Sequence, residues 1–189
     1  LSPSSAASDV YKRQLRYLEE YIKAGIDSVK VEGRMKSHLY ASTISKVYSE
    51  ALSYYKEHGH FLSEKLIEWE EELGKFTHRS YAPVNLIEKA KADTIFDERE
   101  HDSDINYVMV GRVIEANLND SIVIEVRNAF NEGDTIEFLP YQGRAITYQT
   151  NLIKNMHGET IKRTKPTTLV KLPFIENIQV SNVIRMERA

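Results

Sequence analysis

The feature that most constrains the fold is a change in hydrophobic periodicity close to residue 105. Before this point, apolar residues recur at the three- or four-residue spacing of amphipathic helices, and after it they form short runs separated by turn residues. The 189 residues leave room for one small domain and a piece of another. We therefore expect an α+β chain whose first part is mostly helical and whose second part is all β.

The first part begins with a predicted helix and a predicted strand. Leu15, Leu18 and Ile22 recur at helical spacing, and residues 26–32 alternate in polarity as a strand does. One strand cannot form a sheet alone. We interpret residues 15–76 as the end of a larger α/β domain, because their apolar faces have no partners within the chain.

Two longer helices are predicted next. Ser37 can cap a helix whose apolar face runs to Tyr55, and Ser63 can cap a second helix that ends at Gly74. Charged residues then crowd the segment 77–104, which predicts an exposed linker.

Residues 105–189 predict a small all-β domain. Short β-type runs alternate there with turns rich in Asn, Asp and Gly, a pattern typical of a small sandwich or barrel. The candidate strands span residues 108–114, 121–127, 135–139, 145–153, 168–172 and 180–186.

Composition narrows the possible functions. The absence of cysteine excludes disulfides, thiol nucleophiles and thiolate-bound iron–sulfur clusters from these residues, and with six scattered histidines we expect no metal site. The formal net charge of −3 gives no overall basic signature, so any RNA contact depends on local clustering. No apolar run reaches the roughly 18 residues of a membrane span, and we expect a cytoplasmic protein without membrane contact.

Residues 1–14 are expected to be a non-native or disordered tail. Leu1–Ser8 has neither the basic nor the apolar region of a signal peptide. Residues 9–14 resemble translated adaptor sequence, so we expect the native protein to begin further upstream.

A first candidate site follows the predicted strand. Lys30 and Glu32 share one face of that strand, and Arg34 and Lys36 stand where it gives way to the helix capped by Ser37. Cations beside the free N–H groups of a helix start can bind a carboxylate or another anion. The alternative is a Lys30–Glu32 or Glu32–Arg34 ion pair that fixes the end of the strand.

The same residues carry a resemblance to a known family. The string Gly-Ile-Asp-Ser-Val-Lys-Val-Glu-Gly-Arg-Met-Lys-Ser, residues 25–37, with the tyrosine-rich helix after it, looks like the last strand-and-helix unit of the TIM-like barrel of peptidase family U32. The second half resembles the family's C-terminal domain, a small barrel similar to those of translation factors. The residues that carry this second likeness are Gly111–Val113, Ile124–Asn128, Phe130, Gly133–Glu137, Leu172–Phe174 and Val183–Arg185.

The resemblance implies more than one activity. The family name records a collagenase-like peptidase, whereas other members look like RNA hydroxylases that act on the tRNA wobble uridine or on ribosomal RNA with prephenate and an iron–sulfur cluster. Related members hydroxylate a ubiquinone precursor. The resemblance implies that any cluster cysteines lie upstream, and it maps Lys30, Glu32, Arg34 and Lys36 onto the barrel motif as substrate-binding residues. It leaves the catalytic residues unknown.

The second half offers a candidate RNA surface, with Tyr141 as a ring on which a base can stack. The alternative is that the cations form a solvated face and that Phe130, Phe138 and Phe174 belong to the core. The four cations expected to follow a phosphate backbone are Arg144, Lys162, Arg163 and Lys165.

Three functions therefore stand side by side. The first is the C-terminal part of a tRNA-hydroxylating enzyme whose barrel docks RNA, with tRNA and the missing N-terminal barrel of the same protein as partners. The second is a collagenase-like peptidase without its catalytic half, for which the chain offers no Gly-x-Ser-x-Gly or His-Glu-x-x-His motif. The third is a non-catalytic interaction module. In each case we expect the chain alone to be inactive.

Overall fold

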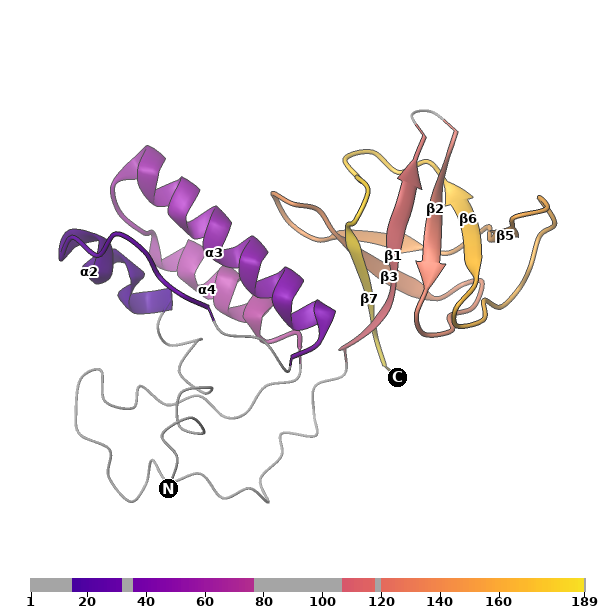
Figure 1. Ribbon diagram of the computed structural model, residues 1–189, viewed down its shortest axis with the longest axis horizontal. Helices are drawn as coiled ribbons and strands as arrows, with labels where there is room; N and C mark the ends of the chain where they lie inside the picture. Colours follow the sequence, from indigo (N-terminus) through magenta and orange to yellow (C-terminus); the bar gives the residue numbers. More distant parts are fainter. Residues whose placement is uncertain (1–14, 32–35, 77–106, 118–119, 189) are drawn as a thin grey trace, which may run out of the picture. The chain divides into compact units, whose positions relative to one another are not determined.

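The computed structural model describes residues 15–31, 36–76, 107–117 and 120–188 (Figure 1). They belong to two compact units, Leu1–Ile105 and Asn106–Ala189, each of which is described by itself. The expected tail, 1–14, and the expected linker, 77–104, lie outside the described residues.

The first unit is helical in the part that the structure describes. Its elements are the short 3-10 helix η2 (Leu15–Tyr17) and the α-helices α2 (Leu18–Lys23), α3 (His38–His58) and α4 (Ser63–Leu73). Figure 1 shows α3 and α4 side by side. Their common core is formed by buried apolar residues, namely Leu15, Leu18, Leu39, Tyr40, Ile44, Val47, Ala51, Trp69, Leu73 and Phe76.

The ends of the two long helices follow local sequence signals. Ser37 caps α3 as predicted, because its Oγ accepts a hydrogen bond from the Tyr40 N–H at 3.2 Å. Gly59 ends α3 in the left-handed conformation, with φ of 74°. The predicted cap of α4 was wrong by one residue: Leu62 occupies the N-cap without a side-chain hydrogen bond, and Ser63 is already helical.

The predicted strand at residues 26–32 does not form in its described part, 26–31. Three of its apolar side chains are exposed instead, by 49% at Ile26, 43% at Val29 and 38% at Val31. A strand gains its hydrogen bonds only from a neighbouring strand, and the described part of this unit contains none. The polar–apolar alternation predicts a strand, but no strand in the described part of this unit can pair with it.

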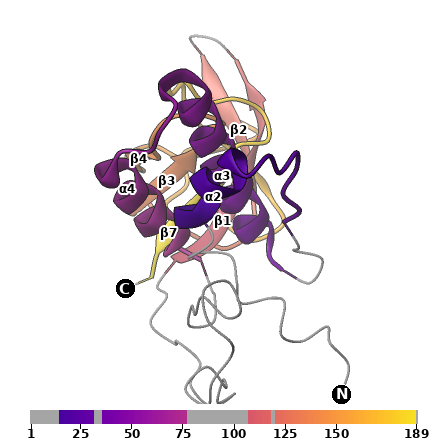
Figure 2. The same cartoon turned by 90° about the vertical axis from the view of Figure 1, so that its left-hand side faces the viewer.

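The second unit is a seven-stranded antiparallel sheet in the order β4-β3-β7-β1-β2-β6-β5. In Figure 1, β3 passes behind β1, and the side view in Figure 2 separates β3 and β4 from β2, so the sheet curls into a half-barrel. The strands are β1 (Tyr107–Ala116), β2 (Ser121–Val126), β3 (Thr135–Leu139), β4 (Ile146–Gln149), β5 (Lys154–Asn155), β6 (Leu169–Pro173) and β7 (Val183–Glu187).

Apolar residues of alternating strand positions fill the inside of the half-barrel. Phe130 and Phe138 are fully buried in this core, as the core interpretation predicts, whereas Phe174 is half-buried. Between β1 and β2 the backbones approach so closely that a Cβ on Gly111 would lie 2.6 Å from the Glu125 carbonyl oxygen. Only glycine fits there, next to the register shift between Met109 and Gly111.

The predicted strands at 108–114, 121–127, 135–139 and 168–172 agree closely with the observed ones. The predicted strand at 180–186 begins too early, because residues 180–182 form a turn and β7 starts at Val183, and the predicted run at 145–153 is too long. That run contains β4 and ends before the separate β5, because the chain turns at Asn151, whose N–H donates to the Gln149 carbonyl at 2.9 Å. Thr150, just before this turn, is fully buried. Its hydroxyl lies 2.6 Å from the Asn131 carbonyl oxygen and 2.9 Å from that of Asp134, and so fixes the turn before β3. Among the described residues, no helix is long and apolar enough to cross a membrane.

Candidate functional site

The predicted anion site before α3 is described only at its two ends. Lys30 lies in an exposed, irregular segment. Lys36 places its Nζ 5.8 Å from the centroid of the Tyr40 ring, in the first turn of α3. Glu32 and Arg34 lie outside the described residues, so the grouping of the four side chains stays a prediction.

Three of the predicted RNA-contacting cations lie on one segment of the half-barrel. Lys162, Arg163 and Lys165 are all exposed. Between them Thr164 is 1% exposed, and its Oγ1 accepts a hydrogen bond from the Phe130 N–H at 2.9 Å. A buried threonine therefore fixes the segment while its cations remain exposed.

Arg144 does not join this group. Arg163 forms a β-bridge with Asn131, at the turn that leads into β3. The five residues of β3 then lead to the loop that holds Arg144, so the two arginines lie at opposite ends of β3. In the loop of Arg144, Tyr141 has a ring that is 54% exposed and a hydroxyl that donates to the Val180 carbonyl at 2.8 Å.

A further pair of cations escaped the sequence prediction. Lys154 of β5 and Lys171 of β6 are direct cross-strand partners. Val170 and Leu172 are buried on either side of Lys171, which places Lys171 on the outer face of the half-barrel. The alternation of Val170, Lys171 and Leu172 is visible in the sequence and predicts the face of Lys171. The position of Lys154 opposite Lys171 depends on the register of the β5–β6 ladder, which the sequence does not show.

Two other arginines of the half-barrel, Arg112 and Arg127, pair with the carboxylate of Glu125. Glu125 accepts a hydrogen bond from Arg112 Nε at 2.5 Å and lies 3.1 Å from Arg127 Nη2. The hydrogen bond from Arg112 holds the pKa of Glu125 below its ordinary value. By contrast, within the described part of the chain, five cations around β5 and β6 form no ion pair, namely Lys154, Lys162, Arg163, Lys165 and Lys171.

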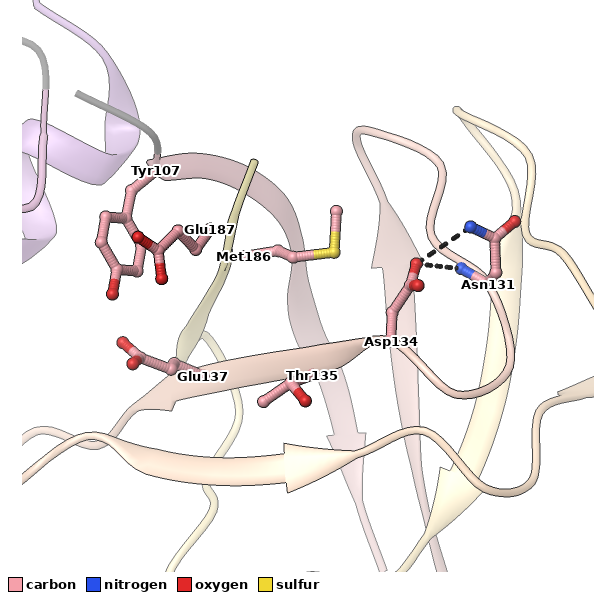
Figure 3. Close-up of a pocket in the computed structure, with 7 residues that line it drawn as sticks. All are labelled: Tyr107, Asn131, Asp134, Thr135, Glu137, Met186 and Glu187. Carbon is pink, nitrogen blue, oxygen red and sulfur yellow. Dashed lines mark hydrogen bonds between the residues drawn. The ribbon is translucent and has the colours of Figure 1, made fainter. Parts of the chain in front are cut away.

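The half-barrel also has a pocket of about 390 Å³ at β3 and β7 (Figure 3). Three of its side chains are carboxylates, those of Asp134, Glu137 and Glu187. Asp134 Oδ2 accepts hydrogen bonds from the backbone N–H of Asn131 at 2.7 Å and from its side-chain amide at 3.0 Å. The remaining lining residues are Tyr107, Thr135 and Met186.

Beneath this pocket lies a buried arginine. Arg185 is fully buried, and its Nε and Nη2 each lie 2.7 Å from Glu137 Oε2. The Tyr107 ring centroid is 5.1 Å from the Arg185 guanidinium carbon, which adds a cation–π contact. Glu137 balances Arg185, so Asp134 and Glu187 leave the pocket acidic. Such a pocket repels phosphate and does not suit the RNA backbone.

Two family models together match most of the chain. The model of peptidase family U32 matches residues 7–95, and the model of the peptidase family U32 C-terminal domain matches residues 105–185. The chain belongs to peptidase family U32. The second match coincides with the half-barrel, so the U32 C-terminal domain is the seven-stranded unit described above.

The chain is also similar to two curated proteins. The chain is 30% identical over 174 residues to "tRNA hydroxylation protein P1" of Bacillus subtilis (strain 168), which covers 89% of the chain and 40% of that protein. It is 27% identical over 149 residues to "tRNA hydroxylation protein P" of Escherichia coli (strain K12), which covers 79% of the chain and 32% of that protein. The chain therefore spans less than half the length of these relatives.

One solved structure similar to the chain is the C-terminal domain of a putative U32 peptidase from Geobacillus thermoleovorans. The match has 22% sequence identity and a TM-score of 0.40, and it covers 42% of this chain and 92% of that domain.

Proposed function

We propose that the chain is the C-terminal part of a U32 protein that hydroxylates the wobble uridine of tRNA in the cytoplasm, with the half-barrel docking the RNA. The observation that carries this proposal is the similarity to tRNA hydroxylation protein P1 along 89% of the chain. Unpaired cations around β5 and β6 support the docking role, because a phosphate backbone needs cations that no carboxylate has neutralised.

The helical unit is proposed to complete a larger TIM-like barrel, and the half-barrel to be related to translation-factor barrels. Ile26, Val29 and Val31 are exposed in a segment whose alternation suits a strand, so its incorporation into a sheet of the rest of the protein, covered on both faces, would bury them. The N-terminal barrel portion of the same protein is thus its first proposed partner. Lys30, Glu32, Arg34 and Lys36 are proposed to bind a substrate carboxylate at this strand end.

The proposed cofactors belong to the rest of the protein. This chain has no cysteine, so its residues do not fit the thiolate ligation that an iron–sulfur cluster requires. Prephenate, a dicarboxylate, suits the proposed cations at Lys30 and Arg34.

The direct test is complementation of a bacterial strain that lacks its own tRNA hydroxylation protein. The full-length protein should restore hydroxylated wobble uridine, measured by mass spectrometry of digested tRNA. A version without residues 105–189 should restore much less, because the RNA-docking half-barrel is missing. Absence of hydroxylation with the full-length protein, despite normal expression, would refute the proposed function.

The family description, which names a peptidase family, favours a second candidate function, peptide hydrolysis, and the substrate class proposed for it is collagen. Gelatin cleavage by the same full-length protein, abolished by a change in its upstream half, would support this candidate. If the protein neither hydroxylates tRNA nor cleaves gelatin, the half-barrel is better regarded as an interaction module.

A further inference from the structure

Two lysines of the half-barrel occupy an electrostatically unfavourable arrangement. Lys154 and Lys171 stand directly opposite each other in the β5–β6 ladder. Side chains in such a pair share a face of the sheet, with Cβ atoms about 5 Å apart, and like charges in this arrangement destabilise the ladder. Neither lysine forms an ion pair with any described residue.

A third lysine, Lys162, belongs to the segment beside β5. Thr160 is bridged to Lys154, which places it beside the lysine pair. The Ile161 N–H donates to the Ile153 carbonyl at 2.9 Å, so this segment runs along β5 as far as the bend at Lys162, which is exposed. Lys154, Lys162 and Lys171 are thus carried by neighbouring segments at the β5 edge of the sheet.

Packing alone explains only part of this arrangement. Val123 is the cross-strand partner of Lys171 on β2 and is 2% exposed, so the aliphatic stem of Lys171 can cover it. A neutral side chain of similar length would cover Val123 equally well. Packing therefore does not account for a second positive charge at Lys154.

We infer that the surface at the β5–β6 edge, formed by Lys154, Lys162 and Lys171, holds the sugar–phosphate backbone of RNA. This inference rests on the proposed function and deepens it by naming the contact surface. Phosphates between the lysines would relieve their mutual repulsion, and the release of counterions would supply binding free energy. The acidic pocket at β3 and β7 cannot bind a phosphate backbone in this way, since Asp134 and Glu187 repel phosphate.

The test measures binding of an unmodified tRNA transcript to the whole chain by fluorescence anisotropy between 50 and 300 mM salt. The variant K154Q/K171Q removes both charges, and K154R/K171R keeps them. The matched control K56Q/R188Q removes two exposed cations that form no described ion pair and lie outside this surface.

The double glutamine variant should bind about tenfold more weakly near 0.1 M salt, and its salt slope should fall by about 1.5, as expected for two lost phosphate contacts. The arginine variant and the control should bind like the unchanged chain. The melting temperature of K154Q/K171Q should stay equal or rise, which separates a binding role from a structural one.

Unchanged tRNA affinity of K154Q/K171Q would overturn the inference while leaving the proposed function intact. Equal weakening in the control variant would overturn it as well, because the effect would then be one of net charge. No binding of tRNA to the unchanged chain at 50 mM salt would refute both this surface and the docking role. Normal binding with no hydroxylation by the full-length protein would refute the proposed function alone.

Discussion

Arg185 and Glu137 face each other across neighbouring strands, with two guanidinium nitrogens of Arg185 each 2.7 Å from Glu137 Oε2. The arginine side chain is fully buried, and the glutamate side chain is 18% exposed. A buried charge is tolerable only while its counter-charge stays in place. The pairing of β3 with β7 therefore brings the counter-charge to Arg185, and so decides whether this buried charge is neutralised.

Breaking this pair from one side should be costly. Glu137→Gln is expected to lower the free energy of unfolding by about 3 kcal/mol, because Arg185 would remain buried without a full counter-charge. The double variant R185M/E137Q should lose less than E137Q alone, since it removes the buried charge as well. Urea unfolding of the unchanged chain, E137Q, R185M and the double variant completes a double-mutant cycle, which measures the coupling free energy between Arg185 and Glu137. Strictly additive losses would contradict this account.

The close approach at Gly111 makes a second prediction. Gly111→Ala would place a Cβ 2.6 Å from the Glu125 carbonyl oxygen and 2.8 Å from the Ile124 Cγ2 atom. Neither the backbone of β2 nor a core isoleucine can move freely, so we expect a loss of about 2–3 kcal/mol in unfolding free energy. Thermal unfolding followed by circular dichroism measures it. A loss under about 0.5 kcal/mol would mean that β1 and β2 separate easily here.

The ion pair at Glu125 predicts a pH dependence. The hydrogen bond from Arg112 lowers the pKa of Glu125 in the folded chain from its ordinary value of 4.5. Its stabilising contribution is therefore complete above pH 4.5 and is lost as the pH falls through the lowered, folded-state pKa. The melting temperature of Glu125→Gln should lie below that of the unchanged chain at pH 7 and approach it as the pH falls below 4.5. A constant difference across this range would contradict the assignment.

The lysine pair makes a prediction about stability that is independent of RNA. Lys171→Gln removes the repulsion with Lys154 and keeps most of the stem over Val123. The free energy of unfolding should rise by roughly 0.3 kcal/mol at low salt, and the gain should shrink as salt screens the charges. Lys56→Gln on α3 provides the control, with no expected salt-dependent gain. A stabilisation that persists at 1 M salt would point to packing instead of charge.

Much of this fold was predictable because local patterns and tertiary structure agree. Alternation located the strands of the half-barrel, and Ser37 and Gly59 mark the limits of α3. The prediction of strand ends failed where contacts between residues distant in the sequence determine the structure. Thr150, directly after β4, is held by hydrogen bonds from its hydroxyl to the Asn131–Asp134 turn, and no local pattern signals such a bond.

The candidate RNA surface was only partly predictable for a similar reason. Lys162, Arg163 and Lys165 are neighbours in sequence, so their grouping could be expected. The position of Arg144, and the meeting of Lys154 with Lys171, depend on strand register. Register follows from turn lengths and from the fit of the core, and a single sequence indicates it weakly.

Substitutions in the exposed segment before α3 should have different effects in this chain and in the full-length protein proposed above. Val29 and Val31 are 43% and 38% exposed, so Val29→Ser with Val31→Ser should change the unfolding free energy of this chain by less than about 0.5 kcal/mol. In the full-length protein, where a neighbouring strand would bury both side chains, the same changes should cost roughly 2–3 kcal/mol. Leu62→Ser, at a position 47% exposed, is the control and should be nearly neutral in both. Equally small effects of the valine changes in both proteins would mean that no upstream strand packs against this segment.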